Sequence, residues 1–105
     1  MSRFAASILA WAALASPASL ADNGKEVYLA SCAACHGQDG RARTAAGRKL
    51  GAKDLTASKL TDAEVRKQVS EGHTDQRGAL MPAFKDILKP DQIDAVVAFA
   101  KTLRK

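Results

Sequence analysis

Large aromatic side chains are scarce in this sequence. Its 105 residues include one tryptophan, one tyrosine and three phenylalanines, and Phe4 and Trp11 belong to an apolar N-terminal run. So few large side chains build only a thin core, and small domains usually compensate with a disulfide, a metal or a cofactor. The shortage therefore predicts that the core depends on such an element.

The sequence also lacks a long apolar segment. The run from 4 to 14 holds about a dozen residues, against the ~20 that a membrane-spanning helix needs. Arg3 precedes this run, Pro17 ends it, and Ser19 and Ala21 supply the small residues that signal peptidase requires. We therefore expect residues 1–21 to be a cleaved secretory signal peptide rather than an anchor helix. Residues 22–105 are then expected to form a soluble domain exported to the periplasm.

Clusters of charge are missing as well. The chain has 16 lysines and arginines and 11 acidic residues, for a formal net charge of +5, and the basic residues are scattered among the acids. Nucleic-acid-binding proteins instead gather their basic residues on one face, so we expect no nucleic-acid partner. Internal repeats and low-complexity linkers are absent too, which predicts a single domain over residues 22–105.

No segment shows the alternation of a β-strand, which predicts an all-α domain of about four short helices. Asn23 and Glu26 fit a capping box for a helix that runs into the cysteines. A second capping box, Thr61 with Glu64, begins a helix for which Gly72 supplies the C-terminal stop.

The last helix is expected to begin near Pro90, because Ile93, Val96 and Val97 recur at helical spacing. Residues 83–88 have the composition of a further short helix. The basic segment 41–53 has no clear periodicity, and we expect it to be a loop along one edge of a cofactor.

The most informative stretch is Cys32-Ala33-Ala34-Cys35-His36. Two thiols three positions apart on a helical turn face the same way, so each can bond one of the two vinyl groups on a porphyrin edge. The imidazole that follows is then placed to serve as the proximal iron ligand. The stretch therefore predicts a c-type haem attachment site, with covalent haem c as the cofactor.

Three other interpretations explain the stretch less well. A thioredoxin-like dithiol would need a strand before it and a βαβ context, which the sequence lacks. A zinc site needs four ligands, but the chain has only two cysteines and two histidines, poorly spaced for one. A structural disulfide across so short a span restricts the unfolded chain little and leaves His36 without a role.

The sixth iron ligand has two candidates, Met81 and His73. Met81 is the only methionine left after signal cleavage, and it lies between an irregular segment and Pro82, where a loop can present one side chain to a fixed point. A gap-filling core methionine is the alternative use of this residue. We favour Met81 because Met/His ligation is the cytochrome c pattern, and His73 would instead give a bis-His haem.

The residues 22–105 resemble a small class I cytochrome c of the cytochrome c6 or short bacterial kind. The resemblance rests on Cys32-Ala33-Ala34-Cys35-His36-Gly37 and on Leu80-Met81-Pro82-Ala83-Phe84. It implies a class I cytochrome c fold wrapped around one haem. The first and last helices of that fold cross, and here Gly24 and Tyr28 would meet Val96 and Phe99.

Members of this family often have a proline whose carbonyl accepts the proximal histidine N–H. In this chain the nearest match is Gly51-Ala52-Lys53-Asp54-Leu55, which has Lys53 in place of the proline.

With both axial positions filled by protein, we expect an electron-transfer protein rather than an enzyme, and we expect its partners to be other redox proteins. The donor is expected to be a periplasmic dehydrogenase or reductase, and the acceptor a terminal oxidase or another cytochrome. Lys85, Lys89, Arg41, Arg43 and Arg48 are candidates for steering an acidic partner. A dedicated electron-accepting subunit of a dehydrogenase and a haem-based ligand sensor are the alternatives, and a monomer is the expected state.

Overall fold

The computed structural model describes residues 20–105. The predicted signal peptide, residues 1–21, therefore lies almost wholly outside the described residues. Within residues 20–105, no helix is both long enough and apolar enough to cross a bilayer.

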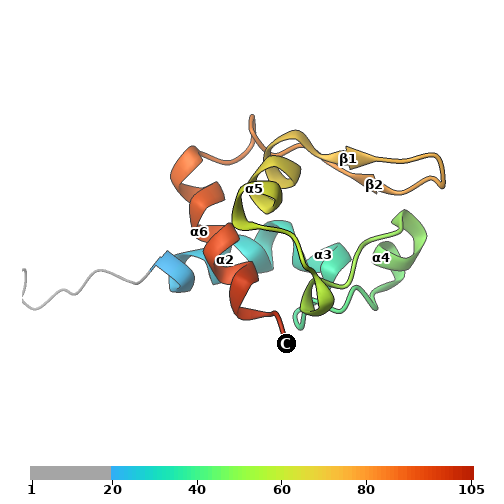
Figure 1. Ribbon diagram of the computed structural model, residues 1–105, viewed down its shortest axis with the longest axis horizontal. Coiled ribbons are helices and arrows are strands. Elements are labelled where there is room, and N and C mark those ends of the chain that lie inside the picture. The colour runs from blue at the N-terminus through green and yellow to red at the C-terminus, as the bar shows by residue number, and fades with distance from the viewer. Residues whose placement is uncertain (1–19) are drawn as a thin grey trace, which may run out of the picture.

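Helices dominate the described part of the chain (Figure 1). In order, its elements are α2 (Leu20–Ser31), α3 (Ala33–His36), α4 (Ala45–Leu50), the 3₁₀ turn η2 (Leu55–Ala57), α5 (Asp62–Glu71), β1 (His73–Thr74), β2 (Leu80–Met81) and α6 (Pro90–Thr102). The predicted all-α class is confirmed, with one small addition. The strands β1 and β2 pair as a two-residue antiparallel hairpin, which the sequence pattern did not predict.

The first and last helices, α2 and α6, cross in close contact (Figure 1). A Cβ placed on Gly24 would overlap the Ala95 carbonyl and lie 2.9 Å from the Phe99 Cβ, so only glycine lets the backbones approach this closely. The Tyr28 and Phe99 rings pack with their centroids 5.1 Å apart at 50°. The predicted crossing is therefore confirmed, with Ala95 as an additional contact of Gly24.

The buried core lies along this crossing. It consists of one residue from α2, one from α5 and three from α6, namely Tyr28, Val69, Ile93, Val96 and Val97. Tyr28 is 1% exposed, and its hydroxyl donates to the Gly37 carbonyl at 2.5 Å. This bond ties the core directly to the segment that follows the Cys-x-x-Cys-His motif.

Helix α5 begins and ends as its sequence predicts. The Thr61 hydroxyl accepts from the Glu64 N–H at 3.1 Å, and the Glu64 carboxylate accepts from the Thr61 N–H at 3.0 Å. Gly72 follows its last turn with φ 75°, in the left-handed region that glycine adopts without strain. Arg66 joins α5 to α6 through an ion pair with Asp94 at 2.7 Å.

Two local predictions were wrong. The segment 41–53 contains the helix α4, with Thr44 as its N-cap and Gly51 in the left-handed conformation at its end. Six residues are too few to show helical periodicity, so these two caps were the usable signal. Residues 83–88 form a single turn rather than a helix, in which the Phe84 carbonyl accepts from Ile87 and Leu88.

Candidate cofactor site

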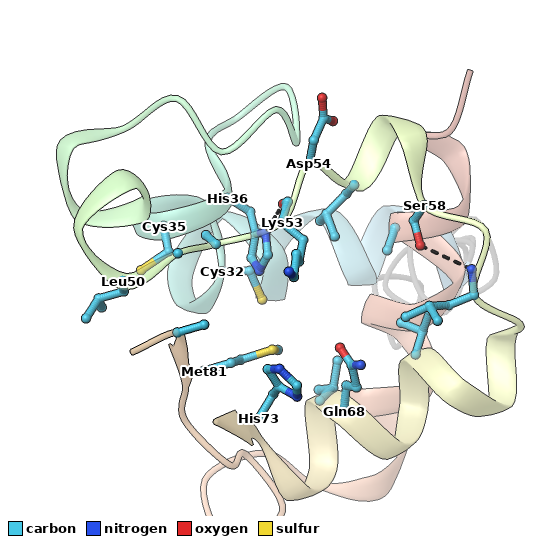
Figure 2. Close-up of a pocket in the computed structure, with 18 of the residues that line it drawn as sticks. Cys32, Cys35, His36, Leu50, Lys53, Asp54, Ser58, Gln68, His73 and Met81 are labelled. Atoms are coloured by element: carbon cyan, nitrogen blue, oxygen red, sulfur yellow. Dashed lines mark hydrogen bonds between the residues drawn. The ribbon is translucent and has the colours of Figure 1, made fainter. Parts of the chain in front are cut away.

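A cavity of about 710 Å³ opens between the Cys-x-x-Cys-His segment and the β1–β2 hairpin. Figure 2 shows Cys32 and His36 on one side of this space and Met81 and His73 on the other. Its walls are largely apolar, and the aliphatic and aromatic lining includes Leu50, Leu55, Leu60, Val65, Val69, Pro82, Phe84 and Val96. Ligand pockets typically measure roughly 300–1,000 Å³, so this cavity is large enough for a sizeable apolar group.

The two cysteines line one end of the cavity. Cys32 immediately precedes α3, Cys35 lies within it, and neither forms a disulfide. Burial, with a smaller contribution from Cys35, raises the pKa of Cys32 to about 11. A dithiol redox centre needs the opposite, a lowered thiol pKa, so the surroundings of Cys32 weigh against that interpretation.

A metal site built from protein ligands alone also lacks support. Within residues 20–105, no three His, Cys, Asp or Glu side chains come close enough to hold a metal ion.

The imidazole of His36 is fixed by a backbone acceptor. Its Nδ1 lies 2.9 Å from the Lys53 carbonyl oxygen, so Nδ1 carries the hydrogen and donates it. The other nitrogen, Nε2, is then free to bind a metal through its lone pair. Burial lowers the pKa of His36, an effect that the bond to Lys53 partly offsets, and the ring is therefore kept in the neutral form that a metal requires.

Thr44 holds the motif against the helix that follows it. Its hydroxyl lies 2.8 Å from the Ala34 carbonyl and 3.0 Å from the Cys35 carbonyl, and it accepts from the Gly47 N–H at 2.9 Å. The N-cap of α4 thus also satisfies carbonyls at the end of α3. Sequence reasoning missed this residue, although a threonine before a short helical run is a recognisable cap signal.

The β1–β2 hairpin carries Met81 on the opposite wall. Met81 pairs with His73, and Leu80 pairs with Thr74. Met81 and His73 both line the cavity and are partly buried. Thr74 and Leu80 are exposed, and of these two only Leu80 also borders the cavity. The structure therefore brings both predicted sixth-ligand candidates to the same cavity wall.

The chain after Met81 is tied to the end of α5. The Phe84 N–H donates to the Val69 carbonyl at 2.9 Å, and the Lys85 N–H donates to the Ser70 carbonyl at 3.1 Å. A Cβ on Gly72 would lie 2.9 Å from the Ala83 nitrogen and would also contact the Met81 carbonyl. Glycine at this helix end therefore lets the methionine segment lie directly against α5.

A second, smaller pocket of about 210 Å³ adjoins the main cavity, and Gly51, Lys53, Asp75 and Ala79 line both. It brings together four basic residues that we call the basic rim, namely Arg48, Lys49, Lys53 and Arg77. Of the five predicted steering residues only Arg48 belongs to it. The other three members come from α4, the loop after it and the hairpin tip, and their proximity could not be read from the sequence.

One carboxylate lies within the basic rim. Asp75 accepts from the Ala79 N–H at 3.1 Å and from the Arg77 N–H at 2.9 Å. These backbone bonds, with that of Ala79 first, lower the pKa of Asp75, and the charges of His73 and Lys53 lower it further. The Asp75 carboxylate thus accepts hydrogen bonds from backbone N–H groups of its own turn. Because the rim has four basic side chains and one carboxylate, its net charge is positive.

The donors around the main cavity fit a covalently attached haem. A large apolar cavity has two thiols at one end, a neutral imidazole with its Nε2 free, and a thioether on the facing wall. Two thiols can take up the vinyl groups of a c-type haem, and histidine with methionine is the iron-ligand pair of cytochromes c, so the residues present fit this group.

Comparisons with known proteins agree with this assignment. Residues 19–99 match the family model described as cytochrome C oxidase, cbb3-type, subunit III. The chain is 39% identical over 90 residues to cytochrome c6 from Nostoc sp. (strain PCC 7120), covering 83% of this chain and 76% of that protein. It is 32% identical over 83 residues to the cbb3-type cytochrome c oxidase subunit FixP from Azorhizobium caulinodans, covering 79% of this chain but only 27% of FixP.

Solved structures show the same fold. The KustC0563 c-type cytochrome has a TM-score of 0.67 at 31% identity, over 78% of this chain and 98% of that chain. A chain of the Kuenenia stuttgartiensis reducing HAO-like protein complex Kustc0457/Kustc0458 has a TM-score of 0.63 at 25% identity, over 87% of this chain and 46% of that one. This chain therefore belongs to the cytochrome c family as a small class I monohaem cytochrome c, with covalently bound haem c as its cofactor and electron transfer as its function.

Proposed function

We propose that Cys32 and Cys35 hold the haem through thioether bonds, and that His36 Nε2 and Met81 Sδ are the axial ligands of its iron. The observation that carries this proposal is the His36 imidazole, whose Nδ1 donates to Lys53 and whose Nε2 is left free beside the two thiols. Met81 on the facing wall completes the pair (Figure 2).

When bound, haem supplies an iron that takes up and returns one electron. Backbone contacts hold the two residues that would bind the iron. The Lys53 carbonyl orients His36, and α5 positions the segment after Met81. With both residues bound, the iron would have no open position for a substrate. We therefore propose an electron carrier that passes electrons at the haem edge and has no catalytic reaction of its own.

We further propose that the carrier works in the periplasm. The support is the N-terminal sequence pattern, a short apolar run after Arg3 that ends in small residues. Covalent haem attachment through cysteines fits an exported protein. N-terminal sequencing of the protein purified from its source tests the expected cleavage after Ala21, and retention of residues 1–21 would contradict it.

Covalent attachment is tested by denaturing mass spectrometry of the red protein after acid–acetone extraction. We expect the mass of one haem to stay on the chain, and fragments to carry it at Cys32 and Cys35. Cys32→Ser and Cys35→Ser variants should each keep at most one thioether bond, and the double variant none. Extraction of all haem from the wild-type protein would contradict the proposal.

Carbon monoxide separates a carrier from a ligand sensor. If His36 and Met81 both bind iron, the reduced protein at neutral pH should bind carbon monoxide far more slowly or weakly than a double variant, Met81→Ala with His73→Ala, which lacks both donors of the facing wall. Equal and rapid binding by both proteins would favour the sensor.

A role as a subunit of a larger redox assembly is the second candidate. Similarity to FixP and to a chain of the HAO-like complex favours it, since both names describe components of multi-subunit proteins. The basic rim would then face an acidic surface of a dehydrogenase or an oxidase. Purification from the native source distinguishes the two roles, because a free carrier elutes alone and a subunit elutes with its enzyme.

A further inference from the structure

We propose that His73 is a reserve iron ligand, which takes the sixth position whenever the Met81 thioether leaves it. This inference rests on the proposed function, because it assumes that His36 holds the haem iron from the other side. It concerns a residue that the proposed carrier mechanism does not use.

The hairpin register places the two side chains together. His73 and Met81 are directly opposite each other in the antiparallel pair, and such partners project from the same face at short range. Both line the main cavity, and Figure 2 shows the His73 ring beside the end of the Met81 side chain. A small movement of this hairpin would therefore exchange one donor for the other.

The His73 imidazole is not held in another role. Within residues 20–105, the His73 ring has a long ion-pair contact with Asp75, with 3.8 Å between His73 Nε2 and Asp75 Oδ2. The His73 side chain is 39% exposed. Ion pairs this long and this exposed contribute little, so turning the ring toward the iron would cost little. His36 differs, because burial and the 2.9 Å bond to the Lys53 carbonyl fix its ring.

The two donors favour different oxidation states. A thioether is a soft donor and raises the reduction potential, whereas imidazole is the harder donor and suits ferric iron. Loss of the thioether should therefore be followed by His73 ligation most readily in the oxidised protein, and the reduction potential should fall. The hairpin would keep the iron six-coordinate and closed to exogenous ligands after damage to Met81.

The test compares three haem-loaded variants by electron paramagnetic resonance of the ferric protein at neutral pH. We expect Met81→Ala to stay mainly low-spin, and the double variant Met81→Ala with His73→Ala to become mainly high-spin. A second double variant, Met81→Ala with Lys53→Ala, is the matched control. It removes one of the two lysine amines that line the cavity, those of Lys53 and Lys59, and should remain low-spin.

Two results would overturn the inference, namely a high-spin Met81→Ala protein or a low-spin signal that survives removal of His73. Added imidazole should restore the low-spin signal of the high-spin double variant, which shows that its haem pocket is intact. The far-red sulfur-to-iron band of the wild type separately reports Met81 ligation. Absence of that band would contradict the proposed function, and the spin states would still decide the role of His73.

Discussion

The Lys53 carbonyl oxygen lies 2.9 Å from His36 Nδ1, across seventeen positions of sequence. Members of the cytochrome c family often use a proline carbonyl to accept the N–H of the proximal histidine. In this chain the acceptor is the carbonyl of Lys53. The contact requires only a backbone oxygen, which every residue has. It fixes the ring orientation and the tautomer, as outer hydrogen-bond partners of metal-bound histidines generally do.

Replacing the Lys53 side chain should therefore leave the proximal ligand intact. We expect Lys53→Ala to keep the wild-type optical spectrum, with the free energy of unfolding changed by less than about 0.5 kcal/mol, as for most exposed positions. Absorbance spectroscopy and denaturant titration measure the two quantities. A changed spectrum would mean that the lysine side chain, rather than its carbonyl, positions His36.

The Tyr28 hydroxyl should contribute to stability in a pH-dependent way. Tyr28→Phe removes its bond to Gly37 and should cost about 1 kcal/mol near neutral pH. Burial, followed by the nearby Cys32 and Asp39, raises the pKa of Tyr28 to about 12 from the ordinary value of 10. The folded protein thus holds this proton more tightly than the unfolded chain, so stability is full below pH 10 and falls between pH 10 and 12.

Denaturant titrations from pH 8 to 12 test this expectation in wild type and Tyr28→Phe. The wild type should lose more stability than the variant over the upper part of that range. Parallel pH profiles would show that Tyr28 does not titrate differently in the folded and unfolded states.

A methyl group at Gly24 should destabilise the crossing of α2 and α6. The added Cβ would overlap the Ala95 carbonyl, and relieving such overpacking typically costs about 1–3 kcal/mol. Alanine regains up to ~1 kcal/mol in helix propensity, so we expect Gly24→Ala to lose about 1–2 kcal/mol in thermal or denaturant unfolding. Lys25→Ala, at the exposed neighbouring position, is the control and should change stability little. A Gly24→Ala protein as stable as wild type would contradict the packing argument.

The basic rim should attract anionic redox partners. With hexacyanoferrate(III) as the probe oxidant, Arg48→Glu should slow oxidation of the reduced protein by about 10-fold at low ionic strength, and added salt should reduce the difference. Lys25→Glu makes the same change in net charge on α2 and should slow the reaction less. Equal slowing by both variants would show that net charge, rather than the rim, controls the rate.

Much of the site could be predicted from sequence because its signals are local. The Cys-x-x-Cys-His spacing predicted a cofactor segment, and the structure places its two cysteines and its histidine at the cavity. The Thr61–Glu64 capping box and Gly72 gave the correct bounds of α5. Met81 and His73 were both recognised as possible ligands, and the structure places both at the cavity. The family resemblance predicted that Gly24 contacts the last helix. A glycine within a helix fits this prediction, because it allows two backbones to approach closely.

The remaining features depend on tertiary structure. A backbone acceptor such as the Lys53 carbonyl has no side-chain signature, so its role could not be read from residue type. The hairpin has only two residues in each strand, too few for an alternating pattern to emerge. The basic rim combines residues from α4, the following loop and the hairpin tip, and only the fold brings them together.

The central claim, that Met81 and His36 are the axial ligands of one haem iron, is tested most directly by absorbance spectroscopy of the oxidised protein. The wild type should show the far-red sulfur-to-iron band, and Met81→Ala should lose it while keeping its covalently attached haem. His73→Ala should keep the band. A wild-type spectrum without the band, or a Met81→Ala spectrum that retains it, would contradict the account.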